Sequence, residues 1–243
     1  MQAYITMPFG HMRHLTPLRR CELLLLLGIL CCASAGRAAE GVAIALVYDT
    51  SGSMREAVRD GKGGRSPKYV IGNRALEEVV GKIERFATNK SAPPVQAGLF
   101  TFSGNGASEV VKFGKFDPAA MRKWLKEYPG PGSGTPLGAA LETASRAVLN
   151  SDMPQKHVLL ITDGVNTAGP DPAQVLPQVM REAERKGVIL FTHFVAFDVA
   201  ARVFEPLKKH GATVVGAANE KELNGQLDFI LEEKILLEKE VKK

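Results

Sequence analysis

Short apolar runs alternate with longer segments of helical periodicity, and this alternation restricts the fold more than any other feature of the sequence. A strand that is followed by a helix and then by another strand favours a parallel sheet, because a parallel crossover needs about a dozen residues or more, usually as a helix. We therefore predict a doubly wound α/β domain with a six-stranded, mostly parallel sheet and helices on both of its faces.

The predicted elements follow from these runs. Residues 42–47 and 158–161 are almost continuously apolar, which is typical of strands buried on both faces. The turn-like residues 103–106 predict that the third strand pairs antiparallel, as one short strand at the sheet edge. The predicted strands are 42–48, 95–102, 109–113, 157–162, 188–196 and 212–215, and the predicted helices are 68–88, 118–127, 136–149, 172–186, 199–210 and 220–242.

The first 35 residues have the pattern of an export signal. Three arginines precede an apolar run at 23–32, and Ala33-Ser34-Ala35 follows it with the small residues of a cleavage site. The run is too short to anchor the chain across a bilayer, and Met12 is an alternative start. We expect a signal peptide at 1–35, one domain at 40–235 and a charged C-terminal tail at 236–243, with no transmembrane segment in the mature chain.

All three cysteines, Cys21, Cys31 and Cys32, lie in the predicted leader, so the mature chain would contain no disulfide. The bulky residues Ile29 and Leu30 argue against a lipid anchor at Cys31 or Cys32, because such sites usually have a small residue there. We therefore predict an extracytoplasmic protein, either in the bacterial periplasm or secreted.

The net charge of +5 is mild, and the leader supplies +2 of it through Arg13, Arg19 and Arg20 against Glu22. No basic stripe with interleaved aromatic residues occurs in the chain. Charge therefore gives no support to nucleic-acid binding.

The stretch Asp49-Thr50-Ser51-Gly52-Ser53 follows the first predicted strand directly. It places one carboxylate and two hydroxyls, all hard oxygen donors, in a tight turn at the carboxyl end of that strand. This arrangement suits a divalent cation, although Asp, Ser and Gly are also ordinary turn formers.

Two further loops offer similar side chains. The strand predicted at 157–162 ends in Asp163, and a Gly-rich loop at 130–134 presents Thr135 at the expected N-cap of the next helix. Taken singly, these residues fit a plain turn and a plain helix cap. Doubly wound sheets bind ligands beyond the carboxyl ends of the strands, where the strand order reverses. The five side chains that we expect to meet there are Asp49, Ser51, Ser53, Thr135 and Asp163.

These segments resemble the von Willebrand factor type A (VWA) domain and its metal-ion-dependent adhesion site (MIDAS). The matching segments are Asp49 to Met54, Gly134 to Leu137 and Ile161 to Gly164, in the order of the family, and the resemblance covers most of residues 41–230. It implies a VWA fold that is Rossmann-like, with a six-coordinate Mg²⁺ or Mn²⁺ site for which Ca²⁺ is an alternative.

The resemblance also implies the roles of the five residues. Ser51 and Ser53 would bind the cation through their hydroxyls, and Asp49, Thr135 and Asp163 directly or through water. The remaining ligand would be an Asp or Glu carboxylate of a partner protein. The expected function is metal-dependent protein binding and adhesion, without enzymatic activity.

Residues 55–67 depart from the family pattern as a longer and more basic insertion, with Arg55, Arg59, Lys62 and Arg65. Beside a metal, these charges could steer acidic partners. The alternative is a mobile, solvated loop without a role.

Two other functions are compatible with an α/β fold of this kind. The first is a metal-dependent hydrolase or phosphatase on an α/β fold, but Ser51 stands where a haloacid-dehalogenase-like phosphatase needs a second acid. In addition, the sequence has no G-x-S-x-G elbow, no P-loop and no zinc-binding histidine spacing. The second alternative is a VWA scaffold that binds no metal.

Overall fold

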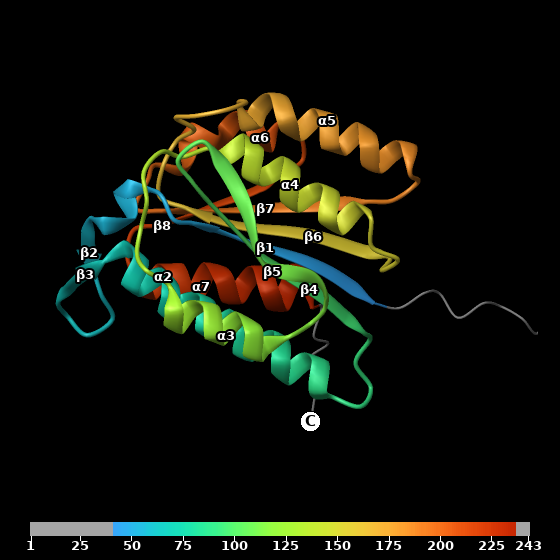
Figure 1. Ribbon diagram of the computed structural model, residues 1–243, viewed down its shortest axis with the longest axis horizontal. Coiled ribbons are helices and arrows are strands. Elements are labelled where there is room, and N and C mark those ends of the chain that lie inside the picture. Colours follow the sequence, from blue (N-terminus) through green and yellow to red (C-terminus); the bar gives the residue numbers. More distant parts are fainter. Residues whose placement is uncertain (1–40, 237–243) are drawn as a thin grey trace, which may run out of the picture. The chain divides into compact units, whose positions relative to one another are not determined.

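The computed structural model describes residues 41–236, and its main feature is a six-stranded sheet with the order β5-β4-β1-β6-β7-β8 (Figure 1). Every neighbouring pair is parallel except β4 and β5, which are antiparallel. The predicted fold is therefore confirmed, including the central first strand beside the strand that ends at Thr162. The strands are β1 Val42–Asp49, β4 Val95–Ser103, β5 Gly106–Lys115, β6 Gln155–Thr162, β7 Leu190–Phe197 and β8 Thr213–Ala217.

Helices cover both faces of this sheet (Figure 1). The first face carries α2 Lys68–Thr88, α3 Pro118–Glu127 and α7 Glu220–Ile230, and the second carries α4 Leu137–Leu149, α5 Pro172–Arg185 and α6 Glu205–Lys208. Side chains of β1 alternate between the two apolar layers, with Ile44 and Leu46 in one and Ala45 and Val47 in the other. Burial on both faces explains why this strand is apolar throughout.

Several predicted boundaries were wrong for local reasons. Helix α4 begins at Leu137 rather than at Pro136. Strand β7 begins two residues later than predicted, because Gly187 has a φ of 67° and ends α5 with a turn that also holds Val188. Strand β5 is longer than predicted, since an edge strand needs few apolar side chains and most of its residues are at least partly exposed.

The last two predicted helices are also shorter than expected. The helix at 199–210 is divided into η2 Ala201–Phe204 and α6, where Pro206 occupies the first turn of α6. Helix α7 ends at Ile230 and continues as a π-helical turn, η3 Leu231–Ile235. The predicted leader and nearly all of the predicted tail lie outside the described residues. None of the helices in residues 41–236 has the length and apolar character needed to cross a bilayer.

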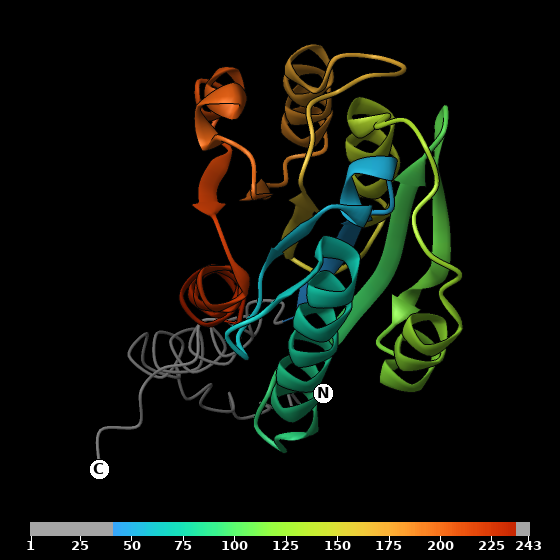
Figure 2. The same cartoon turned by 90° about the vertical axis from the view of Figure 1, so that its left-hand side faces the viewer.

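The basic insertion contains a hairpin that the sequence analysis did not predict, formed by β2 Ala57–Arg59 and β3 Arg65–Pro67 (Figure 2). Its turn is organised by Asp60, whose carboxylate accepts hydrogen bonds from the backbone N–H groups of Lys62 and Gly64. The backbone N–H of Gly61 donates to Glu220 at the start of α7. The insertion is therefore a folded hairpin attached to α7, rather than an irregular loop.

Two buried histidines, His157 and His193, lie on the neighbouring strands β6 and β7. His157 Nδ1 and His193 Nε2 are 3.3 Å apart, and both side chains are almost fully buried. Burial lowers the pKa of His157 from 6.5 to about 3 and that of His193 to about 4. The unfolded chain therefore binds more protons than the folded domain below about pH 6.5.

We expect these two histidines to lower the free energy of unfolding as the pH falls through about 6.5 towards 4, and their contribution to fade as the pH rises above 6.5. NMR titration of the two imidazoles tests this directly. Imidazole pKa values near 6.5 in the folded domain would contradict the prediction.

Candidate metal site at the carboxyl ends of β1 and β6

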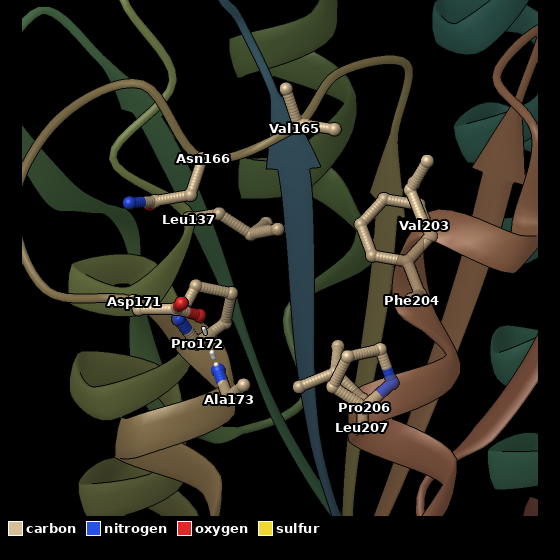
Figure 3. Close-up of a pocket in the computed structure, with 10 residues that line it drawn as sticks. All are labelled: Leu137, Val165, Asn166, Asp171, Pro172, Ala173, Val203, Phe204, Pro206 and Leu207. Carbon is tan, nitrogen blue, oxygen red and sulfur yellow. Dashed lines mark hydrogen bonds between the residues drawn. The ribbon is translucent and has the colours of Figure 1, made fainter.

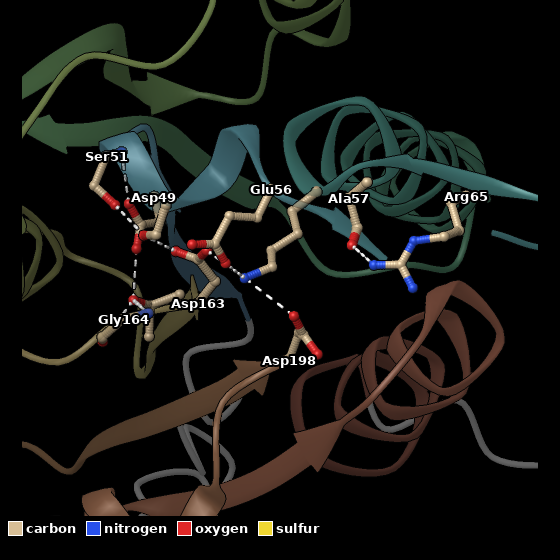
Figure 4. Close-up of polar contacts among 11 residues, drawn as sticks. Asp49, Ser51, Glu56, Ala57, Arg65, Asp163, Gly164 and Asp198 are labelled. Carbon is tan, nitrogen blue, oxygen red and sulfur yellow. Dashed lines mark hydrogen bonds and ion pairs between the residues drawn. The ribbon is translucent and has the colours of Figure 1, made fainter. Parts of the chain in front are cut away.

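Strand β1 delivers the first part of the site. Asp49 is its last residue and is fully buried, and the 3₁₀ turn η1 Gly52–Arg55 follows after Ser51. Asp49 Oδ1 accepts a hydrogen bond of 2.7 Å from the backbone N–H of Ser51, and Oδ2 accepts one of 2.6 Å from Thr162 Oγ1. The hydroxyl oxygens of Ser51 and Ser53 lie 3.2 Å apart. These contacts hold Asp49 in place and bring the two serine hydroxyls together, and Figure 4 shows Ser51 beside Asp49.

Strand β6 delivers the second part. It lies beside β1 in parallel register, with Tyr48 opposite Ile161, so the loops that follow the two strands leave the sheet together. Asp163 follows β6, its side chain is fully buried, and its Oδ1 accepts a hydrogen bond of 2.7 Å from Ser53 Oγ. The two carboxylates therefore meet through the serines of the β1 loop.

Thr135 completes the group from the loop before α4. A Cβ atom at Gly164 would lie 3.5 Å from Thr135 Oγ1 and 3.6 Å from Ser53 Oγ, so the glycine leaves open a space that both hydroxyls face. The predicted capping role of Thr135 was wrong, because Pro136 is the N-cap of α4 and makes no side-chain cap. The backbone of Thr135 instead pairs with Thr167, which ties the loops before α4 and after β6 together.

The structure thus brings together all five residues that the sequence analysis named, and it buries a charge among them. Burial raises the pKa of Asp49 from 3.8 to about 6, opposed by the hydrogen bonds from Ser51 and Thr162. None of the ion pairs within residues 41–236 includes Asp49. A cation bound here would supply the missing counter-charge.

The oxygen spacing is compatible with a small hard cation. The linked oxygens of Ser51, Ser53 and Asp163 are 2.7 and 3.2 Å apart. Neighbouring ligands of an octahedral Mg²⁺ with bonds of about 2.1 Å lie about 3.0 Å apart. In the described part of the chain, no three His, Cys, Asp or Glu side chains form a group that could hold a metal by themselves. The group described here instead combines two carboxylates with hydroxyl oxygens.

The sequence analysis missed two residues that support the site. Thr162 holds Asp49, and only its place beside Asp163 could have indicated a role.

Lys68, the first residue of α2, is 2% exposed, and its ammonium contacts Asp163 (Figure 4). Burial lowers the pKa of Lys68, but hydrogen bonds to Glu56 and Asp163 outweigh this and raise the pKa above its usual value. A lysine in a polar stretch gives no sequence signal of such burial.

A small pocket of about 240 Å³ is lined by apolar side chains together with Asn166 and Asp171 (Figure 3). Leu137 and Val165, which line it, come two residues after Thr135 and Asp163 respectively. Two of its lining residues, Val165 and Val203, are 49% and 41% exposed. A small pocket with two exposed valines therefore adjoins the loops that carry Thr135 and Asp163.

Comparison with known families identifies the domain. The model of the von Willebrand factor type A domain matches residues 43–225. A comparison with curated proteins finds no match.

Solved structures share the fold at low sequence identity. The PilB minor pilin from Streptococcus sanguinis has a TM-score of 0.61 and 16% identity, over 81% of this chain and 62% of that chain. The vWF domain of the type V pili tip protein Mfa5 from Porphyromonas gingivalis has a TM-score of 0.60 and 13% identity, over 81% and 95%. Proximal thread matrix protein 1 from the mussel byssus, with a zinc-occupied MIDAS motif, has a TM-score of 0.58 and 20% identity, over 79% and 48%.

Proposed function

Because this chain belongs to the von Willebrand factor type A domain family, we propose that it binds a divalent cation and, through it, an acidic residue of a partner protein. The observation that carries the proposal is that five oxygen-bearing side chains from three loops lie close together. One of them, Asp49, is buried and has no ion-pair partner in residues 41–236. The five residues are Asp49, Ser51, Ser53, Thr135 and Asp163.

In this proposal each group has a distinct role. The hydroxyls of Ser51 and Ser53 bind the cation, the carboxylates of Asp49 and Asp163 neutralise it directly or through water, and Thr135 binds directly or through water. The cation supplies a positive charge that accepts one more anionic oxygen. Thr162 and the backbone N–H of Ser51 keep both oxygens of Asp49 oriented.

Mg²⁺ is the proposed ion, with Mn²⁺ or Ca²⁺ as alternatives, because these hard cations prefer the all-oxygen ligands available here. The zinc-occupied MIDAS of the byssal protein supports divalent binding in this fold. The pilus proteins among the structural neighbours support a role in adhesion outside the cytoplasm. We further propose that residues 1–35 are an export signal, that 40–235 form the functional domain, and that the protein is a binding module rather than an enzyme.

The surface around the site supports a protein partner. The pocket with the exposed side chains of Val165 and Val203 offers area for contact beside the loops of the site (Figure 3). Arg55, in the turn that carries the serines, donates to the carbonyls of Pro131 and Gly132 and places a positive charge at the rim. Such a rim favours an acidic partner.

Calorimetric titration of metal-free protein with MgCl₂ tests the cation half of the proposal. We expect saturable binding of one ion per chain, reversed by EDTA and accompanied by a higher melting temperature, because a ligand that binds only the folded state stabilises it. A flat titration together with an unchanged melting temperature would contradict a metal site here.

Capture experiments test the partner half. Immobilised protein should retain proteins from an envelope fraction in Mg²⁺ and release them in EDTA, whereas immobilised Asp49→Asn protein should retain none of them. Turnover of phosphate esters by purified protein would instead favour an enzyme.

A further inference from the structure

Lys68 occupies an unusual position beside the candidate metal site. Its Nζ atom lies 2.9 Å from Glu56 Oε2, 3.0 Å from Asp163 Oδ2 and 3.1 Å from Asp198 Oδ2, so three carboxylates surround one ammonium (Figure 4). The side chain is 3% exposed. This is the arrangement of oxygen ligands around a cation, with the ammonium of the protein itself at the centre.

The three carboxylates depend on Lys68 to different degrees. The side chains of Glu56 and Asp198 are 68% and 40% exposed, so water can solvate them without the lysine. The side chain of Asp163 is fully buried, and Lys68 is its one ion-pair partner within residues 41–236. Removal of the ammonium would therefore leave the Asp163 charge uncompensated, unless another cation replaced it.

The backbone of Asp198, which makes one of these contacts, has an unusual conformation. Asp198 is the one non-glycine residue in the described range with a positive φ, at 52°. Its N–H donates to Ala217 at 2.7 Å, which fixes the left-handed conformation just beyond β7. Asp tolerates this conformation better than most residues, but at a cost in free energy. The chain therefore holds Asp198 beside Lys68 by a specific backbone turn.

We propose that the Lys68 ammonium is a built-in counter-cation that competes with the divalent ion for Asp163, and so keeps metal binding weak and readily reversible. The inference rests on the proposed function, because it concerns the affinity of the same site. Asp163 has two oxygens with different partners, since Oδ1 accepts from Ser53 in the candidate ligand group and Oδ2 accepts from Lys68.

Two effects of Lys68 act in the same direction. The ammonium stabilises the metal-free site by compensating a buried carboxylate, which reduces the advantage of binding a metal. After metal binding, the fixed positive charge repels the divalent ion across the same carboxylate, where partial burial weakens screening by water. Both effects lower the affinity for the metal.

The test measures two quantities for the whole chain of each variant. Calorimetry gives the Mg²⁺ affinity, and thermal unfolding gives the melting temperatures of the metal-free and Mg²⁺-saturated forms. Lys68→Met removes the charge and keeps most of the side-chain length. We expect it to lower the metal-free melting temperature, to restore it in Mg²⁺, and to tighten Mg²⁺ binding at least about tenfold. A purely structural role would lower both melting temperatures and would not tighten binding.

Lys82→Met is the matched control, since Lys82 lies on the same helix and pairs with the carboxylates of Asp228 and Glu232 away from the site. It should leave Mg²⁺ affinity unchanged. Lys68→Arg keeps the charge and should bind Mg²⁺ as the wild type does. If Lys68→Met does not fold, Lys68→Gln, which retains a hydrogen-bond donor, should show the same tighter binding.

The outcomes separate this inference from the proposed function. Mg²⁺ binding to the folded Lys68→Met or Lys68→Gln protein that is equal to or weaker than that of the wild type overturns the role of Lys68, while the metal site stands. An absence of Mg²⁺ binding to both the wild type and the lysine variants overturns the proposed function, and the role of Lys68 with it.

Discussion

Replacing Asp49 by asparagine is expected to weaken Mg²⁺ binding by about 100-fold or more, because it removes one of the two carboxylates that can neutralise the cation. The metal-free domain should remain folded, since the asparagine oxygen can still accept from the Ser51 N–H. The folded-state pKa of Asp49 is raised to about 6, so its charged form costs stability as the pH rises from 3.8 through that value. Near pH 7 the metal-free variant should therefore melt no lower than the metal-free wild type.

Asp117→Asn is the matched control for this substitution. Asp117 caps α3 by accepting from the Ala120 N–H and makes none of the contacts described for the site, and Asp and Asn cap helices about equally well. It should leave both stability and Mg²⁺ affinity close to those of the wild type. Calorimetry and thermal unfolding with and without Mg²⁺ measure both quantities. Equal Mg²⁺-induced stabilisation of Asp49→Asn and wild-type protein would remove Asp49 from the metal site.

The second large effect is expected from Gly138→Ala in the first turn of α4. A Cβ atom there would overlap the carbonyl oxygen of Pro170 and lie 2.9 Å from its carbon, and backbone atoms cannot turn aside as a side chain can. Overpacking of this kind costs roughly 1–3 kcal/mol of the free energy of unfolding. For a domain of this size, in which 1 kcal/mol shifts the melting temperature by about 2–4 °C, we expect the melting temperature to fall by roughly 2–12 °C.

The same substitution should also weaken metal binding without touching a ligand. Gly138 is where α4 contacts the loop after β6, and its N–H faces Asn166 Oδ1 at 3.3 Å. Displacing that loop moves Asp163 relative to Thr135, and small displacements of ligands lower affinity for ions with strict geometry. Mg²⁺ titration of the folded variant measures this loss.

Gly225→Ala is a control for which we expect the free energy of unfolding to change in the opposite direction. Gly225 lies inside α7, and a Cβ atom there would meet nothing within 4 Å. Alanine is favoured over glycine in a helix interior by about 0.5–1 kcal/mol, so this variant should be slightly more stable and should bind Mg²⁺ normally. If Gly138→Ala had a melting temperature and a Mg²⁺ affinity like those of Gly225→Ala, the inference that α4 contacts the loop after β6 closely at Gly138 would be wrong.

The sequence alone determined the sheet and the identity of the candidate ligands. The apolar runs of β1 and β6 are buried on both faces, so their pattern is strong, and each ends at a turn with a carboxylate. Topology then required Asp49 and Asp163 to leave neighbouring strands at one edge of the sheet. These inferences depend on local pattern and on the order of elements, which the sequence displays directly.

Only the tertiary structure decided what surrounds the ligands. Lys68 and Asp198 stand 130 residues apart in the numbering, and nothing in either local stretch indicates that they form an ion pair of 3.1 Å beside Asp163. The hairpin of residues 57–67 likewise depends on Glu220, which accepts from Gly61 across the domain. The spacing of apolar residues along the sequence indicates which side chains are buried. The partner of a buried charge depends instead on how distant segments pack together. This packing exists only in the folded chain, so the sequence does not display it.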